Sequence, residues 1–193
     1  MDLKSLATSE ISQAVDEYKK LVDNHQILNQ LTKAAQMSAE SISKGGIVFF
    51  AGNGGSFADA QHMAAELTGK MGRMRISLPG IVLGANSSSM SAIGNDFGYE
   101  YTFSRELEGL HRPSSIVIGF STSGNSKNME VLAQKSHEFG IPMFCFTGEN
   151  LGTISKFCEV IRVPSERTER VQEMHTLLGH LLCLLVEEQL GLV

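Results

Sequence analysis

The stretch Ile47–Gly69, IVFFAGNGGSFADAQHMAAELTG, decides the fold of this 193-residue chain. Residues 47–51 form a short apolar run of β-branched and aromatic side chains that ends at a glycine, as in a buried parallel strand. A glycine-rich turn at 52–56 follows, and the residues after it predict a helix. In such a turn backbone N–H groups can converge, and the positive end of the helix dipole favours an anion. The stretch therefore predicts a strand, an anion-binding turn and a helix.

Two polar residues of this predicted helix share one face. His62 and Glu66 stand four residues apart, which brings their side chains together on an α-helix. An isolated pair of this kind is usually a surface or packed pair rather than a metal site. Its position one to two turns after the glycine-rich turn favours an active site, where an imidazole and a carboxylate lie close to a bound anion.

Length, charge and cysteine content limit the classes of protein that fit. We expect a single domain over residues 1–193, with N-terminal helices in 1–45 and an α/β core in 46–193. The net charge of −5 argues against binding to nucleic acid or to an anionic membrane surface. The N-terminus lacks a signal-peptide pattern, and the most apolar late segment, 176–186, is too short to span a bilayer. Three cysteines without close pairing fit a reduced, cytoplasmic protein.

Apolar periodicity predicts two helices ahead of the first strand. Residues 9–23, with Ser9 as the N-cap, and residues 26–44 carry apolar side chains at helical spacing. Gly45 and Gly46 end the second helix. The two helices can cover the sheet or form a bundle with another subunit, and the sequence leaves both arrangements open.

Strand and helix signals alternate from residue 47 onward. A serine-rich turn at 87–89 leads into a short helix, a loop covers 94–98, and a long helix closes the chain at 169–189. This alternation predicts an α/β fold, a three-layer sandwich with helices on both faces of a five-stranded parallel sheet. Ligands bind such sheets beyond the carboxyl ends of the strands. The apolar runs place the strands at 47–51, 81–85, 115–121, 142–147 and 159–163.

A second turn rich in hydroxyl groups strengthens the prediction of an anion site. The segment STSGNS at 121–126 follows a predicted strand and precedes a predicted helix, as the glycine-rich turn does. A phosphate needs such donors, because backbone N–H groups and neutral hydroxyls at a helix start can bind it without a lysine cluster. Either turn alone is an ordinary connection, but two at matching places predict a phosphate site. Its hydroxyls belong to Ser121, Thr122, Ser123 and Ser126.

The last predicted helix carries Gln172, His175 and His180. A lone histidine among leucines, such as His180, is normally a core residue, but it can also be the polar group that an apolar helix presents to a site. Gln172 and His180 are eight residues apart, about 12 Å along an unbroken helix and turned by roughly 80°. A single metal site that uses both therefore requires long side chains, a helix that starts after Gln172, or ligands from two subunits.

Five motifs together resemble the sedoheptulose 7-phosphate isomerases, or phosphoheptose isomerases, within the sugar-isomerase (SIS) domain family. They are GNGGS at 52–56, the His62/Glu66 pair, GNDFGYE at 94–100, STSGNS at 121–126 and RVQEMHTLLGH at 170–180. The resemblance covers nearly the whole chain, although STSGNS alone marks only the broad family. It implies a flavodoxin-like SIS fold and a homotetramer with sites at subunit interfaces.

The same resemblance implies an aldose–ketose isomerase. The implied product is D-glycero-D-manno-heptose 7-phosphate, on the way to the heptose of lipopolysaccharide or related surface glycans. Glu66 is implied as general base and His180 as general acid, with no nucleotide or organic cofactor. The phosphate is assigned to Ser121, Thr122, Ser123 and Ser126, and the sugar to Asn53, Gly54, Gly55, Glu66, Asn95, Asp96 and Gln172. Family members can hold one zinc ion per subunit at positions matching His62, Glu66, Gln172 and His180.

Three other functions compete with this hypothesis. A non-catalytic SIS scaffold of the replication-initiator-associating type keeps the fold and the hydroxyl turns but lacks the acid–base pair, which this chain has at Glu66 and His180. A sugar-phosphate-sensing regulator usually carries a basic DNA-binding segment, and this sequence shows none. An isomerase for a different sugar phosphate also fits the motifs. We expect the four arginines near these motifs to be solvated on the surface: Arg73, Arg75, Arg167 and Arg170.

Overall fold

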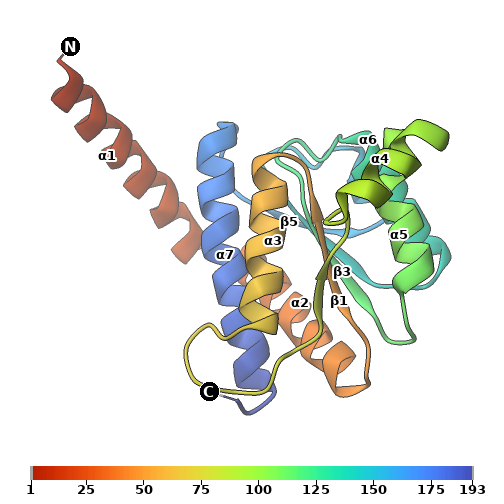
Figure 1. Cartoon of the computed structure of the whole chain (residues 1–193). Helices are drawn as coiled ribbons and strands as arrows, with labels where there is room; N and C mark the ends of the chain where they lie inside the picture. The colour runs from red at the N-terminus through yellow and green to blue at the C-terminus, as the bar shows by residue number, and fades with distance from the viewer. Residues whose placement is uncertain (1, 193) are drawn as a thin grey trace.

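The computed structural model describes residues 2–192 and contains a five-stranded parallel sheet between two layers of helices (Figure 1). The predicted α/β sandwich is therefore confirmed, and the strand ends differ from the predicted ranges by at most three residues. The sheet order is β2-β1-β3-β4-β5, and every neighbouring pair is parallel. The strands are β1 (Val48–Gly52), β2 (Gly80–Val82), β3 (Ile116–Phe120), β4 (Met143–Thr147) and β5 (Glu159–Arg162).

The helices cover both faces of the sheet, because successive strand residues point to opposite sides. The α-helices are α1 (Leu3–Val22), α2 (His25–Ser43), α3 (Gly55–Thr68), α4 (Ser87–Asp96), α5 (Thr102–Leu110), α6 (Lys127–Glu138) and α7 (Thr168–Gln189). Short 3₁₀ helices lie at Tyr99–Tyr101 and Thr153–Lys156. On β1, Val48 and Phe50 pack with α2, α3 and α7, whereas Phe49 and Ala51 pack with α5 and α6.

The strand order creates a switch point between β1 and β3. From β1 the chain moves outward to β2 on one side and then returns to β3 on the other. The turns that follow β1 and β3 therefore lie side by side at the carboxyl edge of the sheet. In flavodoxin-like sheets of this order, ligands bind at that position. Both turns singled out in the sequence, 52–56 and 121–126, lie there.

Helix α1 projects away from the body and does not cover the sheet (Figure 1). It begins at Leu3, so the prediction of Ser9 as N-cap is wrong. Asp2 caps the helix instead, since its carboxylate accepts a hydrogen bond of 3.0 Å from the backbone N–H of Ser5. The apolar stripe of α1 remains open to solvent, with Ile11 66% and Val15 48% exposed.

The predicted loop at 94–98 is mostly helical. Asn86 accepts hydrogen bonds of 3.1 Å from the backbone N–H groups of Ser88 and Ser89, which fixes the start of α4 at Ser87. The helix then continues through Gly94 to Asp96. A glycine inside a helix lowers its stability by only about 1 kcal/mol relative to alanine, so Gly94 does not end the helix. Asn95 and Asp96 thus belong to the last turn of α4 rather than to a loop.

Helices α3 and α7 run parallel and pack in register. Thr176 donates a hydrogen bond of 2.7 Å to Asp59, and one turn further along Gly179 lies against Met63. A β-carbon on Gly179 would lie 2.5 Å from the Met63 sulfur. The absence of a side chain at this position therefore allows the two helices their close approach.

Replacing Gly179 by valine should force α3 and α7 apart. We expect the Gly179→Val variant to lose about 1–3 kcal/mol of unfolding free energy in urea denaturation, because overpacking shifts the backbone. Gly109→Val is the matched control, since a β-carbon at this exposed helical position meets no atom within 4 Å. Equal stability of the two variants would contradict close packing at Gly179.

Candidate active site

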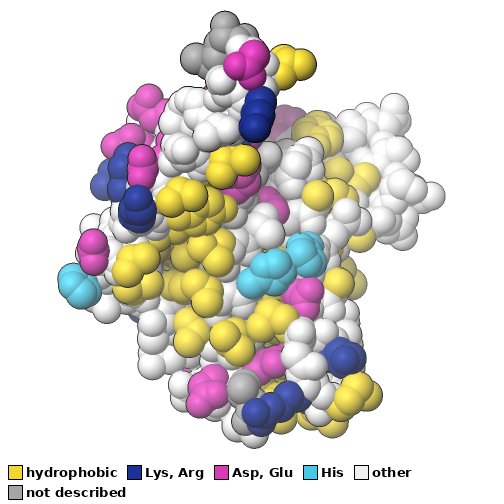
Figure 2. All heavy atoms as spheres, turned by 90° about the vertical axis from the view of Figure 1, so that its left-hand side faces the viewer, with side chains coloured by type: hydrophobic (Ala, Val, Ile, Leu, Met, Phe, Trp, Pro, Cys, Tyr) yellow, Lys and Arg dark blue, Asp and Glu magenta, His cyan; other side chains and the backbone are white. Residues whose placement is uncertain are grey.

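Three predicted side chains from α3 and α7 meet at the surface. The Nε2 atom of His62 lies 3.2 Å from a carboxylate oxygen of Glu66 and 3.3 Å from Nε2 of His180. The two imidazole rings pack edge to face, with centroids 4.7 Å apart. Figure 2 shows histidine side chains on this face of the molecule, next to acidic side chains and a broad apolar area. The parallel packing of α3 and α7 therefore brings a carboxylate and two imidazoles together.

The chemistry of this cluster fits a divalent metal ion. One ligand atom each of His62, Glu66 and His180 lies within 4.8 Å of the others. Two imidazole nitrogens and one carboxylate oxygen are ligands that zinc prefers, and a catalytic zinc typically has three protein ligands and one open position. The Glu66 side chain is only 19% exposed, whereas that of His62 is 46% exposed, so the cluster is open on one side.

The turn after β1 is held by a network of side chains. Asn53 and Asn128 exchange side-chain hydrogen bonds of 2.8 and 2.9 Å, and the Tyr99 hydroxyl donates a third, of 3.0 Å, to the side-chain oxygen Oδ1 of Asn53. Gly54 adopts φ +56°, a left-handed conformation that suits glycine. Beside this turn is a pocket of about 160 Å³ lined by Gly52, Asn53, Gly54, Phe57, Gly84, Met90, Tyr99 and Phe103.

The turn after β3 offers unused hydrogen-bonding groups. The Ser121 hydroxyl is buried and, among the described residues, has no hydrogen-bond partner. Ser126 is the N-cap of α6, but its side chain makes no capping bond, and the first N–H groups of a helix have no intrahelical partner. Thr122 is half-buried and Ser123 is exposed. Unpaired hydroxyls and N–H groups at a helix start suit an anionic oxygen.

The chain has relatives among known proteins. The sequence model of the SIS domain matches residues 12–148. A phosphoheptose isomerase from Campylobacter jejuni is 42% identical over 174 residues, which cover 89% of this chain and 94% of that protein. The chain belongs to the phosphoheptose isomerase family.

Two solved structures of phosphoheptose isomerases share the whole fold. The one from Francisella tularensis has a TM-score of 0.89 at 25% identity, and the one from Neisseria gonorrhoeae has 0.87 at 31% identity. Each comparison covers 97% of this chain and 100% of the other chain. The resemblance found in the sequence motifs is therefore confirmed, including the two N-terminal helices of the fold.

Gln172 lies apart from the histidine cluster of this family member. Helix α7 begins at Thr168 and runs unbroken through Gln172, so the alternative of a helix that starts later is wrong. The Gln172 amide lies against Gly55, where an added β-carbon would be 2.5 Å from Nε2 of the amide. Gly55 and His62 are seven residues apart on α3, about 10 Å along the helix. Within this chain Gln172 therefore sits at the glycine-rich turn.

The other sugar-binding candidates occupy the far layer of the sandwich. Asn95 donates a hydrogen bond of 2.7 Å to Asp96, and both residues are exposed at the end of α4. Tyr99, a few residues later, reaches Asn53 across 46 positions of sequence. Sequence reasoning missed Tyr99 and Asn128. Tyr99 lies inside the motif at 94–100 and Asn128 lies two residues after the motif at 121–126, and these positions could have suggested both residues.

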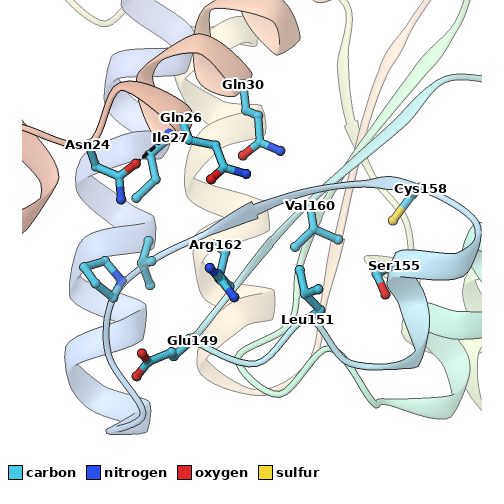
Figure 3. A pocket seen from close by; sticks show the side chains of 12 residues that line it. Asn24, Gln26, Ile27, Gln30, Glu149, Leu151, Ser155, Cys158, Val160 and Arg162 are labelled. Carbon is cyan, nitrogen blue, oxygen red and sulfur yellow. Dashed lines mark hydrogen bonds between the residues drawn. The ribbon is translucent and has the colours of Figure 1, made fainter.

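A larger hollow runs along the edge strand β5 (Figure 3). It measures about 380 Å³ and lies between the start of α2 and β5. Asn24, at its end, uses its side chain to cap the N–H of Ile27. None of the predicted site residues lines this hollow, whose polar side chains come from Asn24, Gln26, Gln30, Glu149, Ser155 and Arg162.

Asp59 on α3 and His175 on α7 are buried titratable residues. Asp59 on α3 lies opposite Thr176, which stands between Gln172 and His180 on α7. Burial raises the pKa of the Asp59 carboxyl, and the hydrogen bond from Thr176 opposes that rise. His175 packs against Phe120 and Phe146, with ring centroids 6.0 and 5.9 Å away, and burial lowers its pKa to about 4.

Among residues 2–192, no helix is long and apolar enough to cross a membrane.

The burial of neutral His175 predicts a stability that depends on pH. As pH falls below 6.5, unfolded chains take up a proton that the folded protein accepts only near pH 4. The unfolding free energy should therefore decrease by about 3 kcal/mol between pH 6.5 and pH 4 because of this residue. We expect His175→Phe to remove most of that decrease in denaturation titrations, and His25→Gln, at an exposed position, to retain it. An unchanged slope in His175→Phe would contradict the assignment.

Proposed function

We propose that this chain is a phosphoheptose isomerase that converts sedoheptulose 7-phosphate into D-glycero-D-manno-heptose 7-phosphate through an enediol. The observation that carries the proposal is the meeting of Glu66, His62 and His180 within hydrogen-bonding distances of one another. Isomerisation of a ketose to an aldose removes a proton from C1, delivers one to C2 and transfers a hydroxyl proton from O1 to O2. A carboxylate and an imidazole beside one enediol suffice for these transfers.

In this mechanism Glu66 accepts the C1 proton and His180 donates a proton to the carbonyl oxygen at C2. The half-buried environment of Glu66 keeps water away from one side of the carboxylate. A zinc ion held by His62, Glu66 and His180 would supply Lewis-acid stabilisation of the enediolate oxygens. Because neither Glu66 nor His180 can bind a metal ion and transfer a proton through the same atom at the same instant, each would have to be free of the ion for the proton transfer that it catalyses. No organic cofactor takes part.

The substrate's phosphate and sugar occupy the carboxyl edge of the sheet. We assign the phosphate to the start of α6, which combines the unpartnered hydroxyl of Ser121, the uncommitted side chain of Ser126 and helix N–H groups that have no intrahelical partner. With a net charge of −5 on the chain, dipoles and hydroxyls rather than lysines bind the phosphate. Thr122 and Ser123 complete the phosphate set, and the sugar is assigned to Asn53, Gly54, Gly55, Glu66, Asn95, Asp96 and Gln172.

The scaffold alternative is less well supported than an enzyme. A binding scaffold has no need for a carboxylate beside two imidazoles, whereas proton transfer requires such groups. An isomerase for a shorter or longer sugar phosphate would use the same groups. We assign a heptose phosphate as the substrate because the chain belongs to the phosphoheptose isomerase family. We also propose that the protein is cytoplasmic and forms one SIS domain over residues 1–193.

Conservative variants of the acid–base pair test the reaction. Purified protein should convert sedoheptulose 7-phosphate in D₂O into aldoheptose 7-phosphate, as followed by NMR. Glu66→Gln and His180→Gln should each lower kcat by roughly 10²- to 10⁴-fold while folding normally, since each removes one proton-transfer group. Glu159→Gln, an exposed carboxylate on β5, is the control that keeps full activity. Full activity of either site variant would contradict the assigned roles.

We also propose a homotetramer in which α1 packs against other subunits. The stripe on α1 and residues Leu177 and Leu184 on α7 are exposed apolar side chains that association would bury. Placing two glutamates in the stripe, Ile11→Glu with Val15→Glu, should therefore lower the mass measured by light scattering. Gln13→Glu, on the same helix, is the control for added charge. An unchanged mass in the double variant would contradict a role for α1 in assembly.

A further inference from the structure

Arg75 is buried, contrary to the expectation of a solvated arginine. Its side chain is 2% exposed and lies 2.6 Å from the carboxylate of Glu187, which is 4% exposed. The loop that contains Arg75 follows α3 and passes beside the lower half of α7 in Figure 1. Two charges buried together in this way require both mutual attraction and further hydrogen bonds to offset their loss of hydration.

The guanidinium meets that requirement by capping the end of α3. It donates hydrogen bonds of 2.6 Å to the backbone carbonyl of Glu66 and 2.7 Å to that of Leu67, and a longer one to Gly69. The last carbonyls of a helix have no intrahelical partner, and the negative end of the helix dipole attracts a cation. One of the carbonyls that Arg75 binds therefore belongs to the proposed general base itself.

Glu187 connects the same guanidinium to the helix of the proposed general acid. It stands seven residues after His180, which places both on one stripe of α7, about 10 Å apart along the axis. Arg75 Nε donates a bond of 2.6 Å to the Glu187 carboxylate. Through Arg75 the end of α3 is therefore fastened to α7 just below the level where Glu66, His62 and His180 meet.

We propose that Arg75 and Glu187 are positioning residues that hold Glu66 on α3 opposite His180 on α7. The inference rests on the proposed isomerase function of this cluster. Arg75 contacts the backbone of Glu66 and lies outside the group of reacting side chains. The glycine-rich turn, beside which the phosphate turn lies, is remote from this clamp, because α3 extends eleven residues, about 16 Å, from Gly55 to Glu66. Loosening the clamp should therefore affect proton transfer more than substrate binding.

The test compares kcat and KM for sedoheptulose 7-phosphate in Arg75→Lys and Glu187→Gln. Lysine keeps the charge but cannot bind several carbonyls and a carboxylate as a planar fork does. The matched controls are Arg162→Lys and Glu159→Gln, which make the same changes at exposed positions of β5. Activities are measured on zinc-supplemented protein and on chelator-treated protein. The assay temperature lies well below the thermal unfolding midpoint of every variant, as measured by circular dichroism.

A positioning role predicts that kcat falls roughly 10- to 100-fold in either clamp variant, since small misplacements of catalytic groups have costs of this size. KM should change less than about threefold, and the controls should match the wild type. If the midpoint falls while kcat stays at the wild-type value, the ion pair serves stability alone and the proposal is overturned. If Arg75→Lys does not fold, the kcat and KM of Glu187→Gln alone test the positioning role.

A crystal structure of the Arg75→Lys variant tests this inference independently of the proposed function. A wild-type protein inactive on sedoheptulose 7-phosphate would overturn the function, and the clamp would then be judged by crystal structures of wild type and Arg75→Lys. A clamp that holds Glu66 on α3 opposite His180 on α7 predicts that the 3.3 Å contact between His62 on α3 and His180 on α7 opens beyond hydrogen-bonding distance in the variant. A contact that stays at 3.3 Å would overturn the clamp.

Discussion

The parallel packing of α3 against α7 is the constraint on which the candidate site depends. Gly179 lets the helices approach at Met63, and the bond from Thr176 to Asp59 fixes their register. One turn further the same register brings Glu66, His62 and His180 together. Each helix alone carries only ordinary polar residues among apolar ones. Their chemistry arises from the pairing, since the base must reach C1 and the acid the oxygen on C2 of the same substrate.

The sheet places the two turns that we assign to the substrate side by side, at the end where α3 begins. Because the strand order switches direction between β1 and β3, the turns after both strands lie at one edge, and helix α3 begins in the first of them. A substrate bound by its phosphate at the start of α6 can extend along the glycine-rich turn towards the cluster. The dipoles of two helix starts then substitute for basic side chains, in agreement with the acidic net charge.

Local patterns predicted much of this arrangement. Apolar runs identified five strands, and the motifs led to a family that the comparisons confirm. The failures have physical causes. Asp2 and Asn86 cap their helices earlier than apolar periodicity suggests, and periodicity carries no information about a cap that lies outside the apolar stripe. The contacts of Arg75 with Glu187, across 112 positions of sequence, arise only when the loop after α3 folds back onto α7.

A double-mutant cycle tests most directly whether Glu66 and His180 act as one unit because α3 and α7 bring them together. The cycle measures kcat for wild type, Glu66→Gln, His180→Gln and the variant that carries both changes. Residues that act on one proton-transfer path give strongly non-additive losses. The account predicts that the double variant is about as slow as the slower single variant. Losses that multiply across the cycle would show independent contributions and contradict it.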